Sequence, residues 1–153
     1  MSREPTLMHR LCEMAGQAYL HHTVRVSEVE ALVDPNFSID GVDHQLVVFR
    51  GTETKLISEG GWVDVLRDLR AYPWRDSRIG WAHTGFLKGA RGVVDKGLFG
   101  VLRKDQPIAM TGHSKGGAIA LPAAAILNEE GFSVNLVVTF GSPRVFTRGS
   151  VKR

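Results

Sequence analysis

Hydrophobic residues recur along the chain at two spacings, one typical of helices and one typical of strands. Helical spacing runs through residues 5–20 and 86–102, whereas residues 24–33 alternate apolar and polar side chains as a half-buried strand does. The unbroken apolar run at 46–49 predicts a strand buried on both faces of a sheet, and 136–140 predicts another buried strand. The chain is therefore expected to combine helices with a sheet.

Turn-forming residues separate these segments. Asp34-Pro35-Asn36 and Asp40-Gly41 predict two turns. We expect a loop over 53–61, a short helix over 62–69 and irregular structure over 72–80. Because strands alternate with helices, the order predicts an α/β fold with a mostly parallel central sheet flanked by helices. The 153 residues fit a single domain.

The most informative motif is a serine between glycines, in the sequence GHSKG at 112–116. A short apolar strand is predicted before it at 108–110 and a helix after it at 114–128, which is the strand–turn–helix context of a nucleophile elbow. The turn forces Ser114 into a strained conformation and exposes its hydroxyl near the amino end of the helix. Free N–H groups at that helix end suit a developing oxyanion. The motif predicts a serine nucleophile.

Composition and charge narrow the possible partners. The 19 Lys and Arg residues and 16 Asp and Glu residues give a formal net charge of +3, with both signs interspersed. A local excess of arginine at 67–78 is broken by Asp68 and Asp76, so we interpret it as solvated surface rather than a nucleic-acid patch. A single cysteine, Cys12, excludes an intrachain disulfide and is predicted to be a small core residue.

The sequence shows no signal peptide and no apolar run long enough for a membrane span. We therefore expect a cytoplasmic protein by default, although export by another route stays open. The histidines and carboxylates lack metal-ligand spacing, so neither a metal nor a cofactor is expected. The oligomeric state cannot be derived from the sequence.

Five sequence blocks together resemble the class 3, fungal-type triacylglycerol lipases, a branch of the α/β-hydrolases. They are VFRGT at 48–52, Trp62 with Asp68 and Leu69, HTGF at 83–86, TGHSKGGA at 111–118 and TFGSPRV at 139–145. A lone G-x-S-x-G is a weak indication, but five blocks in this order are specific. The resemblance covers about residues 46–145 and implies hydrolysis of a small ester or lipid substrate.

The resemblance also implies roles for individual residues. Ser114 corresponds to the nucleophile, and Thr52 to a residue whose backbone N–H and hydroxyl help to form the oxyanion hole. Lys115 would supply the second backbone N–H, at a position where the family more often has leucine. The segment after Thr52 holds the lid in the family. Its apolar residues here are Leu56, Ile57 and Trp62, and a surface loop packed on the core is the alternative interpretation.

The acid and base that activate a serine are not identifiable in this chain. In α/β-hydrolases the order is Ser, then Asp or Glu, then His, but no Asp and no His follow Lys115. His83 and His113 match family blocks in positions other than the base; we expect His83 to bond within the core. The remaining histidines are expected to face solvent; they are His9, His21, His22 and His44.

Three explanations of the missing partners stay open. The sequence could be a truncated lipase-like protein, a degenerate relative, or a protein that recruits an earlier histidine or a partner chain. In the first case the strand at 136–140 would present an open sheet edge. The leading function is a serine ester hydrolase of lipase type. The alternatives are a non-catalytic lipid-binding or interaction module on the same scaffold, and an enzyme acting on other esters.

Overall fold

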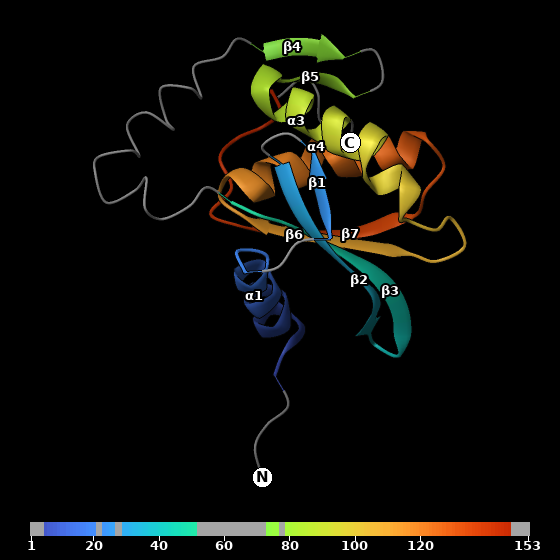
Figure 1. Ribbon diagram of the computed structural model, residues 1–153. Coiled ribbons are helices and arrows are strands. Elements are labelled where there is room, and N and C mark those ends of the chain that lie inside the picture. The colour runs from blue at the N-terminus through green and yellow to red at the C-terminus, as the bar shows by residue number, and fades with distance from the viewer. Residues whose placement is uncertain (1–4, 21–22, 27–28, 52–72, 77–78, 148–153) are drawn as a thin grey trace.

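A central sheet with helices on both faces forms the body of the protein. The computed structural model describes residues 5–20, 23–26, 29–51, 73–76 and 79–147. The sheet has five strands in the order β1-β2-β3-β6-β7, and β4 and β5 form a separate pair. Helix α1 covers one face, and α3 and α4 cover the other (Figure 1). In chain order the elements are α1 (Leu7–Gln17), β1 (Val24–Val26), β2 (Val29–Ile39), β3 (Val42–Phe49), β4 (Pro73–Asp76), β5 (Gly80–His83), α3 (Thr84–Lys96), η2 (Leu98–Gly100), β6 (Ile108–His113), α4 (Lys115–Glu129) and β7 (Val134–Phe140).

The sheet is mixed. Strands β3, β6 and β7 are parallel to one another, as the alternation of strands and helices predicts. Strands β1, β2 and β3 are joined as antiparallel neighbours. Three parallel strands therefore end at the same edge of the sheet, and that edge holds the GHSKG motif.

Both faces of the sheet carry an apolar core. The run predicted to be a buried strand, 46–49, lies in β3 and is fully buried at every position. Its alternate side chains serve opposite faces: Val47 and Phe49 pack with α3 and α4, and Leu46 and Val48 pack with α1. Strand β6 is buried in the same way up to Gly112. The prediction of two-sided burial is confirmed for β3, and β6 is a second buried strand beside it.

Of the two predicted turns, one forms and the other does not. Asp40 and Gly41 form the β2–β3 turn with φ of 49° and 80°, a geometry in which glycine is favoured. The turn predicted at Asp34-Pro35-Asn36 is wrong, because β2 continues through it with a bulge before Phe37. The Asn36 amide donates to Asp34 Oδ1 at 3.0 Å, so the turn-forming aspartate stabilises a local irregularity instead of a reversal.

Two other predicted segments need correction. The strand expected over 24–33 is two strands, β1 and β2, which pair antiparallel with Val26 opposite Val29. The irregular segment expected over 72–80 contains β4, which pairs with β5. In both cases the chain reverses direction within a few residues, and such a hairpin leaves little trace in the spacing of apolar residues. The loop and helix predicted over 53–61 and 62–69 lie outside the described residues.

The helix expected over 86–102 begins and ends earlier than predicted. Helix α3 stops at Lys96, and a short 3₁₀ turn follows at Leu98–Gly100. Gly97 separates them in tight contact with Val24, because a Cβ at position 97 would overlap the valine side chain. The glycine therefore ends the helix and allows it to approach β1 closely.

Surface exposure corrects two further expectations. Cys12 is exposed, since the buried face of α1 consists of Leu11 and Ala15 and the cysteine lies to one side of it. Strand β7 forms as predicted, but most of its residues are only half-buried. Within the described residues β7 lies at one edge of the sheet with β6 as its neighbour, which explains the partial exposure.

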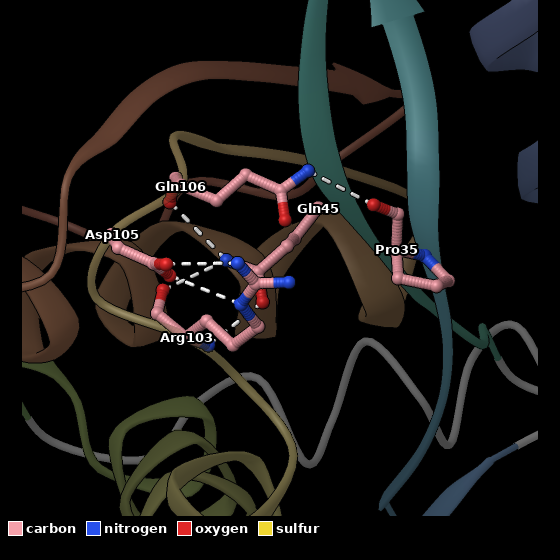
Figure 2. Close-up of polar contacts among 5 residues, drawn as sticks. All are labelled: Pro35, Gln45, Arg103, Asp105 and Gln106. Atoms are coloured by element: carbon pink, nitrogen blue, oxygen red, sulfur yellow. Dashed lines mark hydrogen bonds and ion pairs between the residues drawn. The ribbon is translucent and has the colours of Figure 1, made fainter.

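A buried glutamine fixes the loop before β6. Gln45, in β3, is 1% exposed, and its side-chain amide donates to the carbonyl oxygens of Arg103 at 2.8 Å and Gln106 at 3.2 Å. Its Oε1 accepts from the Arg103 amide at 2.7 Å, as Figure 2 shows. The Gln106 side chain makes a further bond to the Pro35 carbonyl at 2.9 Å. These contacts hold the amino ends of β3 and β6 in register.

We expect Gln45→Leu to lower the free energy of unfolding by about 2 kcal/mol, because backbone groups that the amide satisfies lose their buried partner. Urea denaturation measures the change. The matched control is Gln106→Leu, which removes one exposed hydrogen bond and should cost less than about 0.5 kcal/mol. Equal losses in the two variants would contradict the assignment of Gln45 as the buried clamp.

Candidate active site

The backbone at Ser114 has a strained conformation. β6 ends at His113 and α4 begins at Lys115, so Ser114 is the single residue between strand and helix. Its φ of 52° and ψ of −120° lie in a region that residues with a side chain rarely occupy. The Ser114 amide donates to the Phe140 carbonyl at 2.9 Å, and its own carbonyl accepts from Ala118 at 3.1 Å. Hydrogen bonds on both sides hold the bend.

Two glycines make this bend possible. A Cβ at position 112 would lie 2.7 Å from the backbone of Gly116. A Cβ at position 116 would overlap the carbonyl oxygen of Phe49 and lie 2.8 Å from the carbonyl carbon of Arg50. Real Cβ atoms do not approach backbone atoms this closely. Helix α4 can therefore start directly against the ends of β3 and β6 only because both positions lack side chains.

The amino end of α4 supplies free backbone donors beside the serine. Lys115 is the first residue of the helix, and N–H groups of a first helical turn have no acceptor within the helix. They carry the positive end of the helix dipole, which favours negative charge nearby. Ser114 is only 8% exposed, which corrects the expectation that the turn leaves this residue open to solvent. Its side chain makes no capping hydrogen bond to the helix. Ser114 thus directly precedes the positive end of α4.

The segment that follows β3 packs against the same bend. A Cβ at Gly51 would lie 2.7 Å from the carbonyl oxygen of His113 and would overlap the Tyr19 hydroxyl. Gly51 immediately precedes Thr52, which itself lies outside the described residues. The lid candidates Leu56, Ile57 and Trp62 lie outside them as well. The structure therefore brings the neighbour of Thr52 to the elbow and does not describe Thr52.

The residue before Gly51 forms an ion pair that the sequence did not predict. The Arg50 guanidinium contacts the Glu30 carboxylate, and both side chains are largely buried, at 19% and 11% exposed. Arg25 Nε reaches the other Glu30 oxygen at 3.2 Å from the surface side. The Arg50 amide also donates to the Glu30 carbonyl at 2.9 Å. The only indication in the sequence was Glu30, a charged residue within a segment predicted to be a strand. Its partner Arg50 lies twenty positions away, so the sequence did not show the pairing.

The histidines have distinct environments. His113 is exposed, and its Nδ1 lies 3.1 Å from the Tyr19 hydroxyl. His83 precedes α3, is half-buried and packs on Phe86 with ring centroids 4.5 Å apart. His9 is exposed as expected, beside Glu13. His44 is 5% exposed, which corrects the expectation that it faces solvent: it bonds to the Val42 carbonyl at 2.9 Å and Asn135 at 3.2 Å.

Other kinds of site were also sought. Among the described residues, no group of three or more His, Cys, Asp or Glu side chains is placed to hold a metal ion. No helix in the described part of the chain is long and apolar enough to span a membrane. The elbow is thus the best-supported candidate for a functional centre. His21 and His22 lie outside the described residues.

The central sheet, its flanking helices and the strained elbow define an α/β-hydrolase fold. A solved triacylglyceride lipase of Rhizomucor miehei superposes with a TM-score of 0.59 and 29% identity, covering 80% of this chain and 47% of that one. The Lip2 lipase of Yarrowia lipolytica gives a TM-score of 0.57 and 26% identity, covering 77% and 43%.

The sequence also matches the family described as Lipase (class 3) over residues 46–152, and the chain belongs to this family. A secreted mono- and diacylglycerol lipase of Fusarium solani is 43% identical over 68 residues, which is 41% of this chain and 20% of that protein. The chain therefore spans a fifth of this curated relative and less than half of the two solved lipases.

Proposed function

We propose that this chain carries the nucleophile and oxyanion hole of a carboxylic ester hydrolase of lipase type. In this proposal Ser114 Oγ attacks the ester carbonyl carbon, its proton passes to a base, and the carbonyl electron pair moves to the oxygen. The backbone N–H groups of Thr52 and Lys115 then donate to that oxyanion. Its collapse breaks the ester C–O bond, and the leaving oxygen takes the proton back from the base to depart as the alcohol. A water then attacks the acyl-serine in the same way, which releases the acid and returns the proton to Ser114. The observation that carries the proposal is the strained Ser114 backbone, held beside the free amides of α4.

The surrounding structure supports this assignment. Gly51, which precedes Thr52 in the sequence, packs against the elbow at His113. Membership of the class 3 lipase family and the similarity to a solved triacylglyceride lipase support an ester substrate. Acylglycerols are the class of ester to test first. We further propose that the apolar residues Leu56, Ile57 and Trp62 belong to a lid over this site.

The base and its orienting acid are not assigned to any residue here. Within the sequence, no His and no Asp follow Lys115, although both follow the nucleophile in α/β-hydrolases. The two later acids, Glu129 and Glu130, lie at the far end of α4 from Ser114. We therefore expect this chain by itself to show little turnover, with residual reactivity arising from the oxyanion site.

Labelling with a fluorophosphonate tests the nucleophile directly. The serine oxygen forms a bond to phosphorus and fluoride leaves, so the product mimics the oxyanion and needs no later deacylation step. We expect labelling of the folded chain at Ser114, mapped by mass spectrometry, and loss of that label in Ser114→Ala. The control is Ser133→Ala, at an exposed serine before β7, which should label like the wild type. A folded chain without label at Ser114 would overturn the proposal.

A second candidate function is a non-catalytic module that binds lipid on the same scaffold. The same preparation distinguishes the two. Binding of a fluorescent fatty acid with no fluorophosphonate labelling indicates the module, whereas labelling at Ser114 indicates the hydrolase site.

A further inference from the structure

The hydroxyl of Tyr19 reaches two backbone segments that meet at the elbow. Tyr19 lies in the turn after α1, where its amide donates to the Gly16 carbonyl at 3.1 Å. Its hydroxyl lies 3.1 Å from Nδ1 of His113, the residue immediately before Ser114. The two residues are 94 positions apart in the sequence, so this contact depends on the tertiary fold.

The same hydroxyl also contacts Gly51, the residue immediately before Thr52. The Gly51 amide donates a hydrogen bond to the phenol oxygen. The approach is close enough that a Cβ at position 51 would overlap that oxygen. One hydroxyl therefore joins the end of β3 to the end of β6 on the side of the proposed oxyanion hole.

The tyrosine ring is itself held in place. The Arg50 guanidinium lies 5.7 Å from the ring centre, within the range of a cation–π contact. Arg50 is anchored in turn by its ion pair with Glu30. The ring of Tyr19 therefore contacts an arginine that is itself held by Glu30 of β2.

The hydroxyl of Tyr19 is protonated at neutral pH. Burial raises the pKa of Tyr19 above its usual value, against the opposing effects of the Arg50 charge and the Gly51 hydrogen bond. The phenol therefore keeps its proton at neutral pH. The protonated hydroxyl can pair with His113 Nδ1 in either tautomer of the imidazole: it donates to a bare Nδ1 and accepts from a protonated one.

We propose that Tyr19 is a positioning residue whose hydroxyl ties the Gly51 segment to the nucleophile elbow through Gly51 and His113. Since Gly51 is bonded to Thr52 and His113 to Ser114, the bridge sets the spacing between the two amides proposed to bind the oxyanion. This inference rests on the proposed function for its catalytic consequence, whereas the bridge is a separate structural claim.

Tyr19→Phe removes the hydroxyl and keeps the ring. We expect exchange of the Gly51 amide hydrogen to become about tenfold faster, because it loses its acceptor. The ¹⁵N resonance of His113 Nδ1 should shift as its hydrogen-bond partner disappears. Phosphonylation of Ser114 should slow about tenfold in its maximal rate, with less than a twofold change in the probe concentration for half-maximal rate.

The matched control is Asn135→Ala. It also removes one side-chain hydrogen bond to a histidine, His44, but at the start of β7, away from the elbow. It should leave the Gly51 exchange rate, the His113 resonance and the phosphonylation rate unchanged. Unfolding curves for both variants establish that each is folded under the assay conditions.

The outcomes separate the two proposals. A Tyr19→Phe variant with wild-type Gly51 exchange and an unshifted His113 resonance overturns the bridge. Changed NMR properties with an unchanged maximal labelling rate overturn its positioning role. A wild type that is never labelled at Ser114 overturns the proposed function, and the two NMR measurements then decide the bridge by themselves.

Discussion

Gly116→Ala is expected to lower the free energy of unfolding by about 3 kcal/mol or more and to reduce labelling of Ser114 at least tenfold. The new Cβ would overlap the Phe49 carbonyl oxygen and lie 2.8 Å from the Arg50 carbonyl carbon. Both are backbone atoms of the β3 end, which cannot rotate away as a side chain could, so the cost lies at the upper end for overpacking. Relief of the clash requires α4 to move from β3, which separates the amides of Lys115 and the Gly51 segment.

Urea denaturation gives the loss of stability, and phosphonylation kinetics on the folded variant give the loss of reactivity. The matched control is Gly16→Ala in the last turn of α1, where a Cβ would have nothing within 4 Å. That change should be neutral or stabilising, by up to about 1 kcal/mol, because alanine favours a helix over glycine. A Gly116→Ala variant as stable as Gly16→Ala would mean that α4 does not pack on β3 as described.

Glu30→Gln is expected to cost about 3 kcal/mol. The substitution keeps the size of the side chain but removes the negative charge opposite Arg50, and both groups are more than four-fifths buried. Loss of the negative charge beside a largely buried cation is destabilising, even where the intact pair adds little. Arg50 contacts the ring of Tyr19, and the Tyr19 hydroxyl pairs with His113. We therefore also expect the His113 resonance to shift in this variant. Chemical denaturation followed by circular dichroism measures the stability change.

An exposed ion pair provides the comparison. Asp105 accepts from Arg103 at 2.8 Å, but the two side chains are 69% and 64% exposed. The contact lowers the pKa of Asp105 through the hydrogen bond from Arg103, yet water and salt screen such pairs. Asp105→Asn should therefore leave the unfolding curve unchanged. A loss as large as that of Glu30→Gln would show that burial does not distinguish the two pairs.

The sequence predicted most where local chemistry decides the structure. The run at 46–49 is apolar at every position, which only a strand buried on both faces accommodates, and β3 is buried there throughout. Asp40 and Gly41 tolerate positive φ, and the hairpin turn forms at them. The glycines around Ser114 likewise predicted the strand–turn–helix arrangement that the structure shows.

Segments without such local determinants were predicted less well. Residues 72–80 were expected to be irregular, because Pro73 and Gly80 weaken any strand pattern, yet β4 pairs with β5 there. The burial of two residues was predicted wrongly: Cys12 is exposed and His44 is buried. Residue type is a weak guide to burial when a helix face or a strand neighbour decides it.

By itself, the sequence determined the central strands, the elbow glycines and the family blocks, because short-range sterics and an ordered motif depend on neighbouring residues. The tertiary structure alone decided that Tyr19 meets both His113 and Gly51, and that Glu30 pairs with Arg50. These contacts join residues that are far apart in the chain, and their geometry is fixed by strand register and helix packing. No spacing along a single sequence encodes such distances.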